Sequence, residues 1–429
     1  MREMKDSGVE WIGAIPISWE LNKIGALYDE RSIKVSDTEY PPLSVTKQGI
    51  VPQLETAAKT DNGDNRKLIK KNDFVINSRS DRRGSCGISE YEGSCSLINT
   101  VLRPRKNMCN AYYGYVFRSE LFADEFYRWG NGIVDDLWST KWSNMKKIYI
   151  PSPSIDEQQR IADYLDEKCS KIDAIIEKQQ TVIEKLKVYK LSIITEAVTK
   201  GLNPDVEMKD SDIPWIGSIN AAYDLVKIGT FCFVTKLAGF EYTDTMVQNI
   251  SDDAEVPIVR AQNVRMHWFN DEINEFITMD VSEKLSRCAL DRKCLLITFI
   301  GAGIGDVCIF DKSTRYHLAP NVAKIVIRDE FKKTIDEEYL MYYLSSYAGK
   351  GEINKISKAS AQPSLSMGTI RGIRFILPPM DIQRKIATIL NEKCNKISKN
   401  IENRQEIIEK LATCKKSLIY EVVTGKKEV

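Results

Sequence analysis

The sequence predicts an α+β protein in which two mixed α/β domains are joined by two long helices that pair as an antiparallel coiled coil. Two internal repeats carry this prediction. Residues 4–25 recur as residues 208–229, and residues 153–199 recur as residues 378–424. The first repeat has an offset of 204 residues and the second an offset of 225, so two dissimilar inserts lie between the repeated segments. A duplicated frame that carries two different inserts suggests one task performed on two different targets.

The order of the repeated segments also predicts a circular arrangement with pseudo-two-fold symmetry. Residues 196–200 lead through a short linker into the second copy of the first repeat, which starts at residue 208. The matching residues 421–425 lie beside the C-terminus, and the first copy of that repeat starts at residue 4. The two chain ends are therefore expected to lie close together.

Four segments follow from this pattern. We expect a first α/β domain at residues 1–150, a long helix at 151–203, a second α/β domain at 204–376 and a second long helix at 377–429. The second insert is longer than the first by 21 residues, which is the difference between the two offsets.

A run of about 45 residues without proline or glycine predicts the first long helix. Pro151 and Pro153 precede the run, and Gly201 follows it, as is typical of a helix end. Asp156 and Glu157 suit the N-terminus of a helix because they complement its dipole. At 1.5 Å per residue, such a helix would be on the order of 65 Å long.

In both copies of this helix, apolar residues alternate four and three apart, which is the pattern of a coiled-coil seam. The seam positions are Leu165, Cys169, Ile172, Ile176, Ile183, Leu186 and Ile193 in the first copy and Leu390, Cys394, Ile397, Ile401, Ile408, Leu411 and Leu418 in the second, with polar breaks at Gln179, Lys190, Arg404 and Lys415. So narrow a stripe requires a partner helix, and the repeated copy is the obvious one. The stripe alone leaves parallel pairing and an ordinary bundle helix open. Antiparallel pairing is favoured because it places the two inserts at opposite ends.

The composition opposes several classes of protein. No run approaches 18 apolar residues, and the first residues lack the apolar stretch of a signal peptide, so neither a membrane span nor secretion is expected. The ten cysteines form no CxxC pair and are expected to be reduced and buried in a cytoplasmic protein. His267 and His317 are the only histidines, which opposes a zinc site and a histidine-based catalytic triad.

The charges balance overall, with 61 lysines and arginines against 60 aspartates and glutamates. Their distribution is uneven, because ten basic residues face five acidic ones between residues 64 and 106. A nucleic-acid-binding face and an ordinary solvated surface explain this patch equally well.

The two inserts share an order of elements in spite of their weak identity. Strand-like residues 73–77 and 295–299 are each followed by a loop, a hairpin, a helix (residues 111–126 and 337–346) and a polar loop. The loops are rich in side chains that hold phosphates or read base edges, although for any single loop a plain surface loop is the commoner interpretation. The candidate DNA-binding residues are Lys47, Gln48, Arg79, Arg82, Arg83, Ser139, Lys141 and Trp142 in the first insert and Arg260, Gln262, Asn263, Arg265, Lys358, Gln362, Ser364 and Ser366 in the second.

A glycine-rich segment at residues 298–306 superficially resembles a nucleotide-binding or S-adenosylmethionine-binding turn. Such a turn requires a helix next and an acidic residue about 20 positions later. Here strand-forming residues 307–310 follow, so we expect a β-hairpin turn. The sequence contains neither a Walker A motif nor the Asn/Asp-Pro-Pro-aromatic motif of amino-methyltransferases, which opposes a stand-alone methyltransferase.

Over essentially its whole length, the chain resembles the specificity (S) subunits of type I restriction–modification systems. The segments that carry the resemblance are residues 11–16 and their repeat 215–219, residues 151–162 and their repeat 377–387, and residues 362–366. The chain departs from the family pattern at two positions of the second copy: Ile382 stands where the first copy has the acidic Glu157, and Asn220 stands where it has Pro16.

The resemblance implies that each insert is a target-recognition domain that reads one half of a bipartite, asymmetric DNA site. It also implies that the long helices act as a spacer and bind two methyltransferase (M) subunits, with restriction (R) subunits joining that core. S-adenosylmethionine, ATP and Mg would then belong to the partners, and no catalytic residue, cofactor or metal is expected in this chain.

The protein would thus be a non-catalytic subunit that directs adenine methylation and DNA cleavage in phage defence. The alternative is a coiled-coil scaffold that binds only proteins. Salt-dependent DNA binding separates the two, because contacts with phosphates weaken as salt rises.

Overall fold

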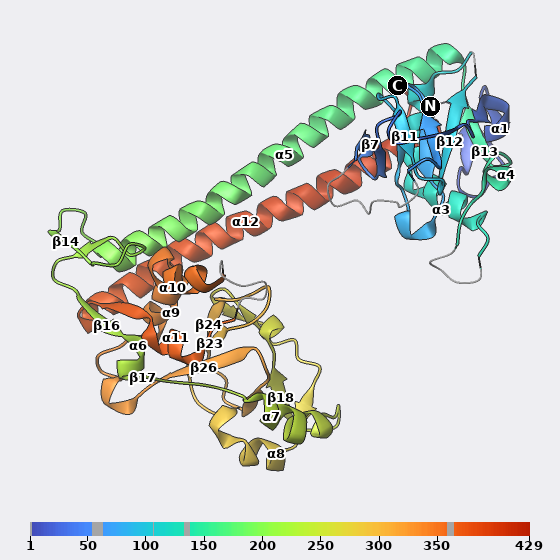
Figure 1. The fold of residues 1–429 in the computed structure, drawn as a ribbon. Coiled ribbons are helices and arrows are strands. Elements are labelled where there is room, and N and C mark those ends of the chain that lie inside the picture. Colours follow the sequence, from blue (N-terminus) through green and yellow to red (C-terminus); the bar gives the residue numbers. More distant parts are fainter. Residues whose placement is uncertain (1, 54–62, 106, 133–137, 358–363) are drawn as a thin grey trace. The chain divides into compact units, whose positions relative to one another are not determined.

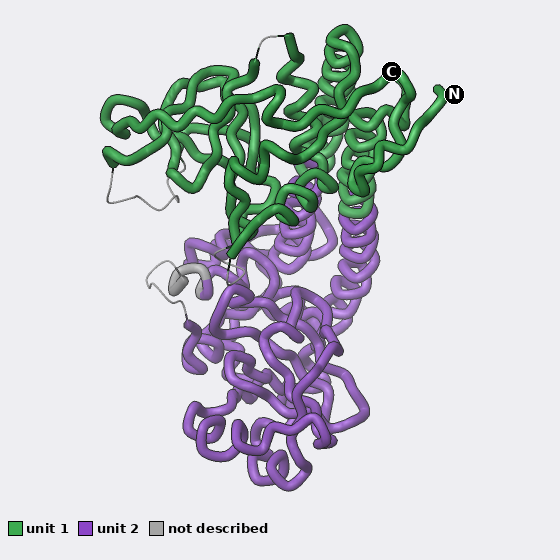
Figure 2. Tube along the Cα trace, turned by 90° about the vertical axis from the view of Figure 1, so that its right-hand side faces the viewer, with its two compact units in different colours: residues 1–180, 405–429 green, residues 181–404 purple. Residues whose placement is uncertain are grey.

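The computed structural model describes residues 2–53, 63–105, 107–132, 138–357 and 364–429. The chain divides into two compact units (Figures 1 and 2): unit 1 comprises residues 1–180 and 405–429, and unit 2 comprises residues 181–404. Each unit contains one insert and a part of both long helices, so neither unit is a single linear segment.

The two predicted long helices are confirmed. Helix α5 (Ile155–Lys200) has 46 residues, and helix α12 (Met380–Val423) has 44. Gly201 follows α5 with a φ of +90°, a conformation that glycine adopts without steric cost and that is common where helices end.

In unit 1, the first part of α5 packs against the last part of α12. Leu165 and Val422 belong to one buried cluster. Farther along, the Lys415 ammonium donates to both carboxylate oxygens of Asp173 at 2.7 Å. Later residues of α5 therefore meet earlier residues of α12, and the pairing is antiparallel.

In unit 2, the last part of α5 packs against the first part of α12 in the same sense. The Lys190 ammonium donates to the Ser398 hydroxyl at 2.9 Å, and Ile194 shares a buried cluster with Leu390. Lys190 and Lys415 are equivalent positions of the repeat, as are Asp173 and Ser398. The two polar contacts are thus the two copies of one contact, and each sets the register of the helix pair at a polar break of the seam.

The insert of unit 1 contains two small antiparallel sheets and a hairpin. The four-stranded sheet has the order β10 (Cys86–Ile88), β9 (Phe74–Asn77), β12 (Asn99–Pro104), β4 (Tyr28–Glu30). The three-stranded sheet has the order β11 (Gly93–Cys95), β8 (Arg66–Ile69), β5 (Lys34–Val35), and β6 (Leu43–Thr46) pairs with β7 (Gly49–Pro52). The helices are α1 (Ile24–Leu27), α2 (Asn110–Arg118), α3 (Glu120–Arg128) and α4 (Trp142–Met145), with a 3₁₀ turn η1 (Ser80–Arg82).

The insert of unit 2 repeats the central sheet and enlarges the second one. The central sheet has the order β17 (Cys232–Lys236), β26 (Val322–Ile327), β23 (Cys294–Thr298), β24 (Val307–Phe310). The second sheet has the order β21 (Phe276–Ile277), β18 (Val256–Val259), β25 (Tyr316–Leu318), β22 (Ala289–Leu290), and β19 (Val264–Arg265) pairs with β20 (Trp268–Phe269). The helices are α6 (Ile228–Phe231), α7 (Gly239–Glu241), α8 (Met279–Lys284), α9 (Glu337–Ser345), α10 (Tyr347–Ser357) and α11 (Met367–Gly372), with short helical turns η3 (Tyr242–Met246), η4 (Val247–Asn249), η5 (Ala261–Asn263), η6 (Ser286–Cys288) and η7 (Asp329–Phe331).

The repeated frame adds two short strand pairs to each unit. They are β1 (Met4–Asp6) with β2 (Ala14–Pro16) and β3 (Glu20–Lys23) with β13 (Tyr149–Ser152) in unit 1, and β14 (Met208–Asp210) with β15 (Ser218–Asn220) and β16 (Asp224–Lys227) with β27 (Arg374–Leu377) in unit 2. The predicted helix at residues 111–126 is interrupted, because Ser119 is in an extended conformation and its hydroxyl caps α3.

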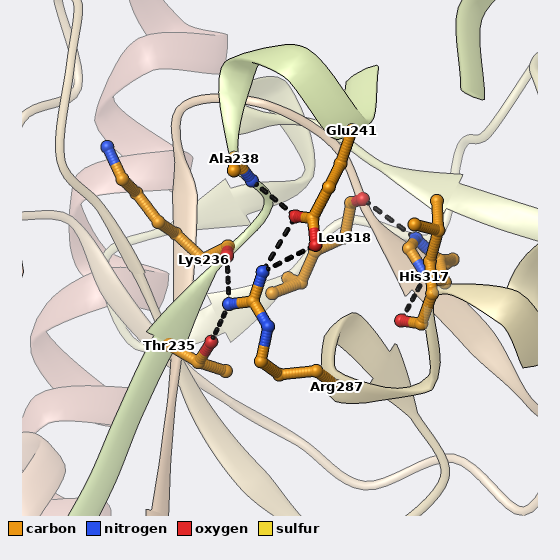
Figure 3. A network of polar contacts seen from close by, with 8 residues as sticks. Thr235, Lys236, Ala238, Glu241, Arg287, His317 and Leu318 are labelled. Carbon is orange, nitrogen blue, oxygen red and sulfur yellow. Dashed lines mark hydrogen bonds and ion pairs between the residues drawn. The ribbon is translucent and has the colours of Figure 1, made fainter. Parts of the chain in front are cut away.

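Most of the 21 extra residues of the second insert lie between strands β17 and β23. The offset between equivalent residues grows from 204 at Cys232 to 221 at Thr298. A polar network ties this enlarged region to the central sheet (Figure 3). Arg287 donates to both carboxylate oxygens of Glu241 at 2.8 and 2.7 Å and to the hydroxyl of Thr235 at 2.6 Å. A planar guanidinium suits such a paired contact, so the network anchors α7 and η6 to strand β17.

A buried glutamine joins the insert of unit 1 to its long helix. The side-chain amide of Gln158 donates to the carbonyl of Pro153 at 2.8 Å, and its oxygen accepts from the backbone N–H of Cys109 at 2.9 Å. Cys109 is the residue that precedes α2, where N–H groups lack partners within the helix. One side chain thus connects the proline segment, α5 and the insert helix.

Unit 2 contains the same joint. The amide of Gln383 donates to the carbonyl of Pro378 at 2.8 Å, and its oxygen accepts from the backbone N–H of Asp336, which precedes α9, at 3.0 Å. Both glutamines are buried. We call these two joints the glutamine latches.

One of the two departures from the family pattern, Ile382 at the position of Glu157, has a structural counterpart. Glu157 accepts a hydrogen bond of 3.0 Å from the indole N–H of Trp19. Where Ile382 replaces Glu157, Tyr223 replaces Trp19, so the indole donor and its acceptor change together.

The prediction that the chain ends lie close together is confirmed in unit 1, where Arg2 forms an ion pair of 3.2 Å with Glu428.

The glutamine latch of unit 1 yields a stability prediction. Gln158→Ala should lower the free energy of unfolding by about 2 kcal/mol, because it leaves the buried N–H of Cys109 without a partner. Chemical denaturation of the full chain measures this loss. The matched control is Gln159→Ala, which removes a neighbouring, exposed glutamine. Equal stability of the two variants would contradict the role assigned to the latch.

Candidate nucleic-acid interface

In unit 1, the arginine-rich loop is the hairpin turn that connects β9 to β10. Its residues are Ser78–Gly84, and we call it turn 1. The turn is closed by hydrogen bonds from the N–H of Asn77 to the carbonyl of Ser85 at 2.9 Å and from the N–H of Ser85 to the carbonyl of Arg82 at 3.0 Å. Gly84 takes a φ of +76°, which only glycine adopts freely.

In unit 2, the glycine-rich segment forms the matching hairpin turn between β23 and β24, as predicted. Its residues are Phe299–Gly305, and we call it turn 2. The N–H of Thr298 donates to the carbonyl of Asp306 at 3.0 Å, and the N–H of Asp306 donates to the carbonyl of Gly303 at 2.9 Å. Every residue of turn 2 lies 221 positions after its equivalent in turn 1. The two turns share their closing hydrogen bonds, but their backbones differ at Gly301, whose φ is +101°, because the equivalent residue Ser80 begins the 3₁₀ turn η1.

The second predicted loop lies beside the turn in each unit. In unit 1, Arg79 forms an isolated β-bridge with Ser139, and the N–H of Thr140 donates to the carbonyl of Ser78 at 2.9 Å. The structure therefore brings together two loops that are about 60 residues apart in the chain.

The same pairing of loops recurs in unit 2. Ile300 bridges Ser364, and the N–H of Leu365 donates to the carbonyl of Phe299 at 2.9 Å. Ser364 is exposed beside turn 2. The predicted residues Lys358 and Gln362 lie outside the described residues.

Turn 1 presents cations to solvent. The side chain of Arg82 is 67% exposed and lies 3.4 Å from Asp81, and the half-exposed Arg83 forms an ion pair with Asp124. Exposed ion pairs of this kind are worth little, so phosphate groups could replace the carboxylates. Beside the turn, Lys141 is exposed, and Arg79, Ser139 and Trp142 are partly buried.

The hairpin β6–β7 contributes a third loop to this region of unit 1. Lys47 and Gln48 are exposed at its tip. A Cβ on Gly49 or Gly87 would lie 3.0 or 3.1 Å from the guanidinium of Arg118, so the tip lies against strand β10 with Arg118 beside it. Sequence reasoning missed the exposed Arg118, because only the approach of these two glycine backbones places this helix-terminal cation near the loops.

In unit 2, the predicted loop at residues 260–265 divides into two kinds of residue. Gln262 and Arg265 are exposed. Asn263 is only 1% exposed: its amide donates to the carbonyls of Asn270 and Glu272 at 3.0 Å each, and its oxygen accepts from the N–H of Arg260.

Asn263 therefore shapes the loop, and a contact between its amide and a base would require the loop to open. Arg260 is also held inside unit 2, because its Nε donates to Glu275 at 2.8 Å. Ser366 caps α11 by accepting from the N–H of Thr369 at 2.9 Å, although it is exposed.

The basic patch between residues 64 and 106 is smaller in the structure than the sequence suggests. Arg66 is buried and donates to Ser94 at 2.8 Å. Lys67 donates to the carbonyl of Asn99 at 2.8 Å. Arg105 and Arg103 bind Asp29, and these contacts, first that of Arg105, lower the pKa of the Asp29 carboxyl. Of the cations left at the surface, Arg82 and Arg83 lie in turn 1, whereas Lys70 and Lys71 precede β9 at its other end.

Both histidines lie in surroundings that favour their neutral form. Burial first, and then the charges of Lys190 and Lys350, lower the pKa of His267 to about 3, so that this histidine is neutral at physiological pH. Burial also lowers the pKa of His317. No group of three potential metal ligands occurs in the described ranges, and none of the described helices is long and apolar enough to cross a membrane.

The cysteines are free, as predicted. Nine are buried, and Cys414 is exposed. Burial raises the pKa of Cys86 to about 12, which keeps this thiol protonated and poorly nucleophilic.

Each insert presents a hairpin turn that is bridged to a second loop, and the two inserts stand on a duplicated frame. This is the arrangement expected of a recognition protein with two reading sites. Comparison with known proteins identifies the family. The model of the "Type I restriction modification DNA specificity domain" matches residues 30–185 and 233–410. The chain therefore belongs to the DNA-specificity subunits of type I restriction–modification systems, and its function is sequence-specific DNA recognition in such a system.

Individual relatives agree with this family. The chain is similar to the type I restriction enzyme MjaVIII specificity subunit of Methanocaldococcus jannaschii, at 23% identity over 96% of this chain and 93% of the relative. It is 22% identical to the EcoKI specificity subunit of Escherichia coli K12, over 74% of this chain and 67% of the relative. A solved structure described as "Structural basis underlying complex assembly and conformational transition of the type I R-M system" has a TM-score of 0.70 at 13% identity, over 96% of this chain and 99% of that chain, and supports the fold.

Turn 1 yields a prediction about arginine contacts. If Arg82 or Arg83 makes a bidentate contact with a base, its replacement by alanine should cost about 1–3 kcal/mol and relax one base of one half-site. If it holds only a phosphate, binding should weaken for all sequences alike and the salt slope should fall by about one unit. Methylation of a library randomised across the site, at several salt concentrations, distinguishes the two.

The matched control is Arg103→Ala. Arg103 is 60% exposed and paired with Asp29, but it lies at the far end of strand β12 from turn 1. If Arg82→Ala and Arg83→Ala both behave like this control, turn 1 does not face DNA.

Proposed function

We propose that the protein reads a bipartite, asymmetric DNA site, with one half-site for each insert. The observation that carries this proposal is that the same arrangement of loops occurs in both inserts with different side chains. A seven-residue turn bridged to a polar loop occurs in both inserts, at Arg79 with Ser139 and at Ile300 with Ser364. Because the side chains of the two turns differ, the two inserts are expected to select different bases.

The loops that we assign to DNA are those exposed around the two turns. In unit 1 they hold Lys47, Gln48, Arg79, Arg82, Arg83, Ser139, Lys141 and Trp142, and Arg118 is added to them. In unit 2 they hold Gln262, Arg265, Ser364 and Ser366, with Arg260 and Asn263 shaping the loop; Lys358 and Gln362 stay predictions from the sequence.

Type I specificity subunits work with methyltransferase and restriction subunits on DNA. We propose that two methyltransferase subunits bind this chain, one at each copy of the frame. Exposed apolar side chains on α5 support a protein partner, because Val188 is 69% and Tyr189 is 55% exposed. S-adenosylmethionine, ATP and Mg would be bound by the partner subunits.

In this proposal the chain itself is non-catalytic and directs adenine methylation and cleavage by its partners. The support is chemical: the sequence lacks an amino-methyltransferase motif, and burial keeps His267 neutral. A scaffold that binds only proteins is the competing function, and the exposed apolar residues of α5 would suit it equally. Salt-dependent binding of the full chain, assembled with its methyltransferase subunit, to duplex DNA would exclude that alternative.

The bipartite site is tested by exchanging one insert. Residues 24–148 should be replaced with the corresponding insert of another family member, which leaves strands β3 and β13 native. One half of the methylated motif should change, while the other half and the spacing persist, because the second insert and the helices are untouched. Methylation-sensitive sequencing of cellular DNA gives the motif directly.

The wild-type protein is the reference, and its motif should consist of two different short halves around unspecified bases. A palindromic or continuous motif would contradict the proposal. So would an exchange that alters both halves together.

A further inference from the structure

Turns 1 and 2 share their closing hydrogen bonds but present different side chains to solvent. Turn 1 carries three arginines, whereas the middle of turn 2 consists of Gly301, Ala302 and Gly303. A Cβ built on Gly301, whose φ is +101°, would meet nothing within 4 Å, so this part of turn 2 is bare backbone that faces open space. Glycine allows a ligand to approach the backbone closely. Whatever reads a base here must therefore lie beside or beneath the turn.

Asp306 occupies that position. It follows turn 2 directly and is partly buried. One of its carboxylate oxygens lies 3.1 Å from the place that a Cβ on Gly303 would take, so the carboxylate folds back over the turn. The equivalent residue in unit 1 is Ser85, which is buried and whose N–H donates to the carbonyl of Arg82 in turn 1.

The carboxylate of Asp306 forms no hydrogen bond or ion pair with any of the residues that the structure describes. Burial raises the pKa of Asp306, and the positive charges of Lys350 and Arg265 oppose that shift from a distance. A partly buried carboxylate without a direct partner destabilises the folded protein. Such a group is therefore a candidate for contact with a ligand.

The chemistry of a carboxylate restricts what that ligand can offer. An ionised carboxylate only accepts hydrogen bonds. In the major groove, the base-edge donors are the exocyclic amino groups of adenine and cytosine. Exposed Arg265 and Ser364 flank the site and could position the DNA backbone.

We propose that Asp306 determines specificity in the second insert by accepting a hydrogen bond from the amino group of adenine or cytosine, which the glycines of turn 2 allow to come close. The inference rests on the proposed reading of one half-site by each insert. It also assigns the two inserts different mechanisms. The first reads with side chains of its turn, and the second reads with a residue beneath its turn.

The test uses the full chain assembled with its methyltransferase subunit and a DNA library randomised across both half-sites. Asp306→Asn keeps the shape of the side chain but removes its charge and one acceptor. It should lower the preference for adenine or cytosine at one position of one half-site by about 10–100-fold and leave the other half-site unchanged. The identity of the relaxed base shows which amino group is read.

Asp311→Asn is the matched control, because Asp311 is an exposed carboxylate at the opposite end of the same strand, β24. It should leave every position unchanged. A second measurement separates reading from folding: a base analogue that lacks only the amino group should impair methylation by the wild type but not by Asp306→Ala.

Unchanged preferences in both Asp306 variants would overturn the proposal. An equal loss of methylation for all sequences, together with a lower melting temperature, would also overturn it, because it would mean that Asp306 only stabilises the turn. A wild-type library result without two half-sites would instead refute the proposed function, so the two failures are distinguishable.

Discussion

The rest of the structure depends on the buried hydrogen bonds of the two glutamine latches. Gln158 and Gln383 each satisfy a backbone N–H at the start of an insert helix while holding the proline carbonyl that leads into a long helix. An unsatisfied N–H in that position would cost about 1–3 kcal/mol, so each insert is held on its helix in one geometry. In unit 2 the latch contacts only backbone groups of the insert, whereas in unit 1 Gln158 also donates to the hydroxyl of the insert residue Tyr113 at 3.3 Å. Most of the contacts of the two latches are therefore made to backbone, which leaves the other side chains of the inserts free to differ.

The two turns likewise share backbone hydrogen bonds and differ in their side chains. Their closing hydrogen bonds are equivalent, from Asn77 to Ser85 and from Thr298 to Asp306. The arginines of turn 1 carry charge that suits phosphates and guanine edges. The glycines of turn 2 leave room for a ligand to come close to the carboxylate of Asp306. In the proposed function, the two turns would therefore read bases in two different ways. The polar register contacts, Lys415 with Asp173 and Lys190 with Ser398, follow the same rule, because one contact position holds different partners in the two units.

The long helices could be predicted to within a few residues at each end, because repetition, seam spacing and bounding prolines and glycines are local signals. The hairpin at residues 298–306 was predictable because strand-forming residues follow it. The internal hydrogen bonds of polar side chains were not predictable: the buried amide of Asn263 binds carbonyls of its own loop, and the exposed hydroxyl of Ser366 caps α11. Arg66 was expected at the basic surface, but it is buried and donates to Ser94. These outcomes depend on tertiary partners that sequence spacing does not reveal, and the exposed Arg118 was missed for the same reason.

The central claim is that turns 1 and 2 face opposite halves of one DNA site. Site-specific photocrosslinking tests it most directly, with a photoreactive residue placed at Asp81 in turn 1 or at its equivalent, Ala302, in turn 2. Both residues are exposed. The account predicts that each probe crosslinks to a different half-site, whereas a probe at the exposed Asp311 does not crosslink. Crosslinks from neither turn, or from both turns to the same half-site, would contradict it.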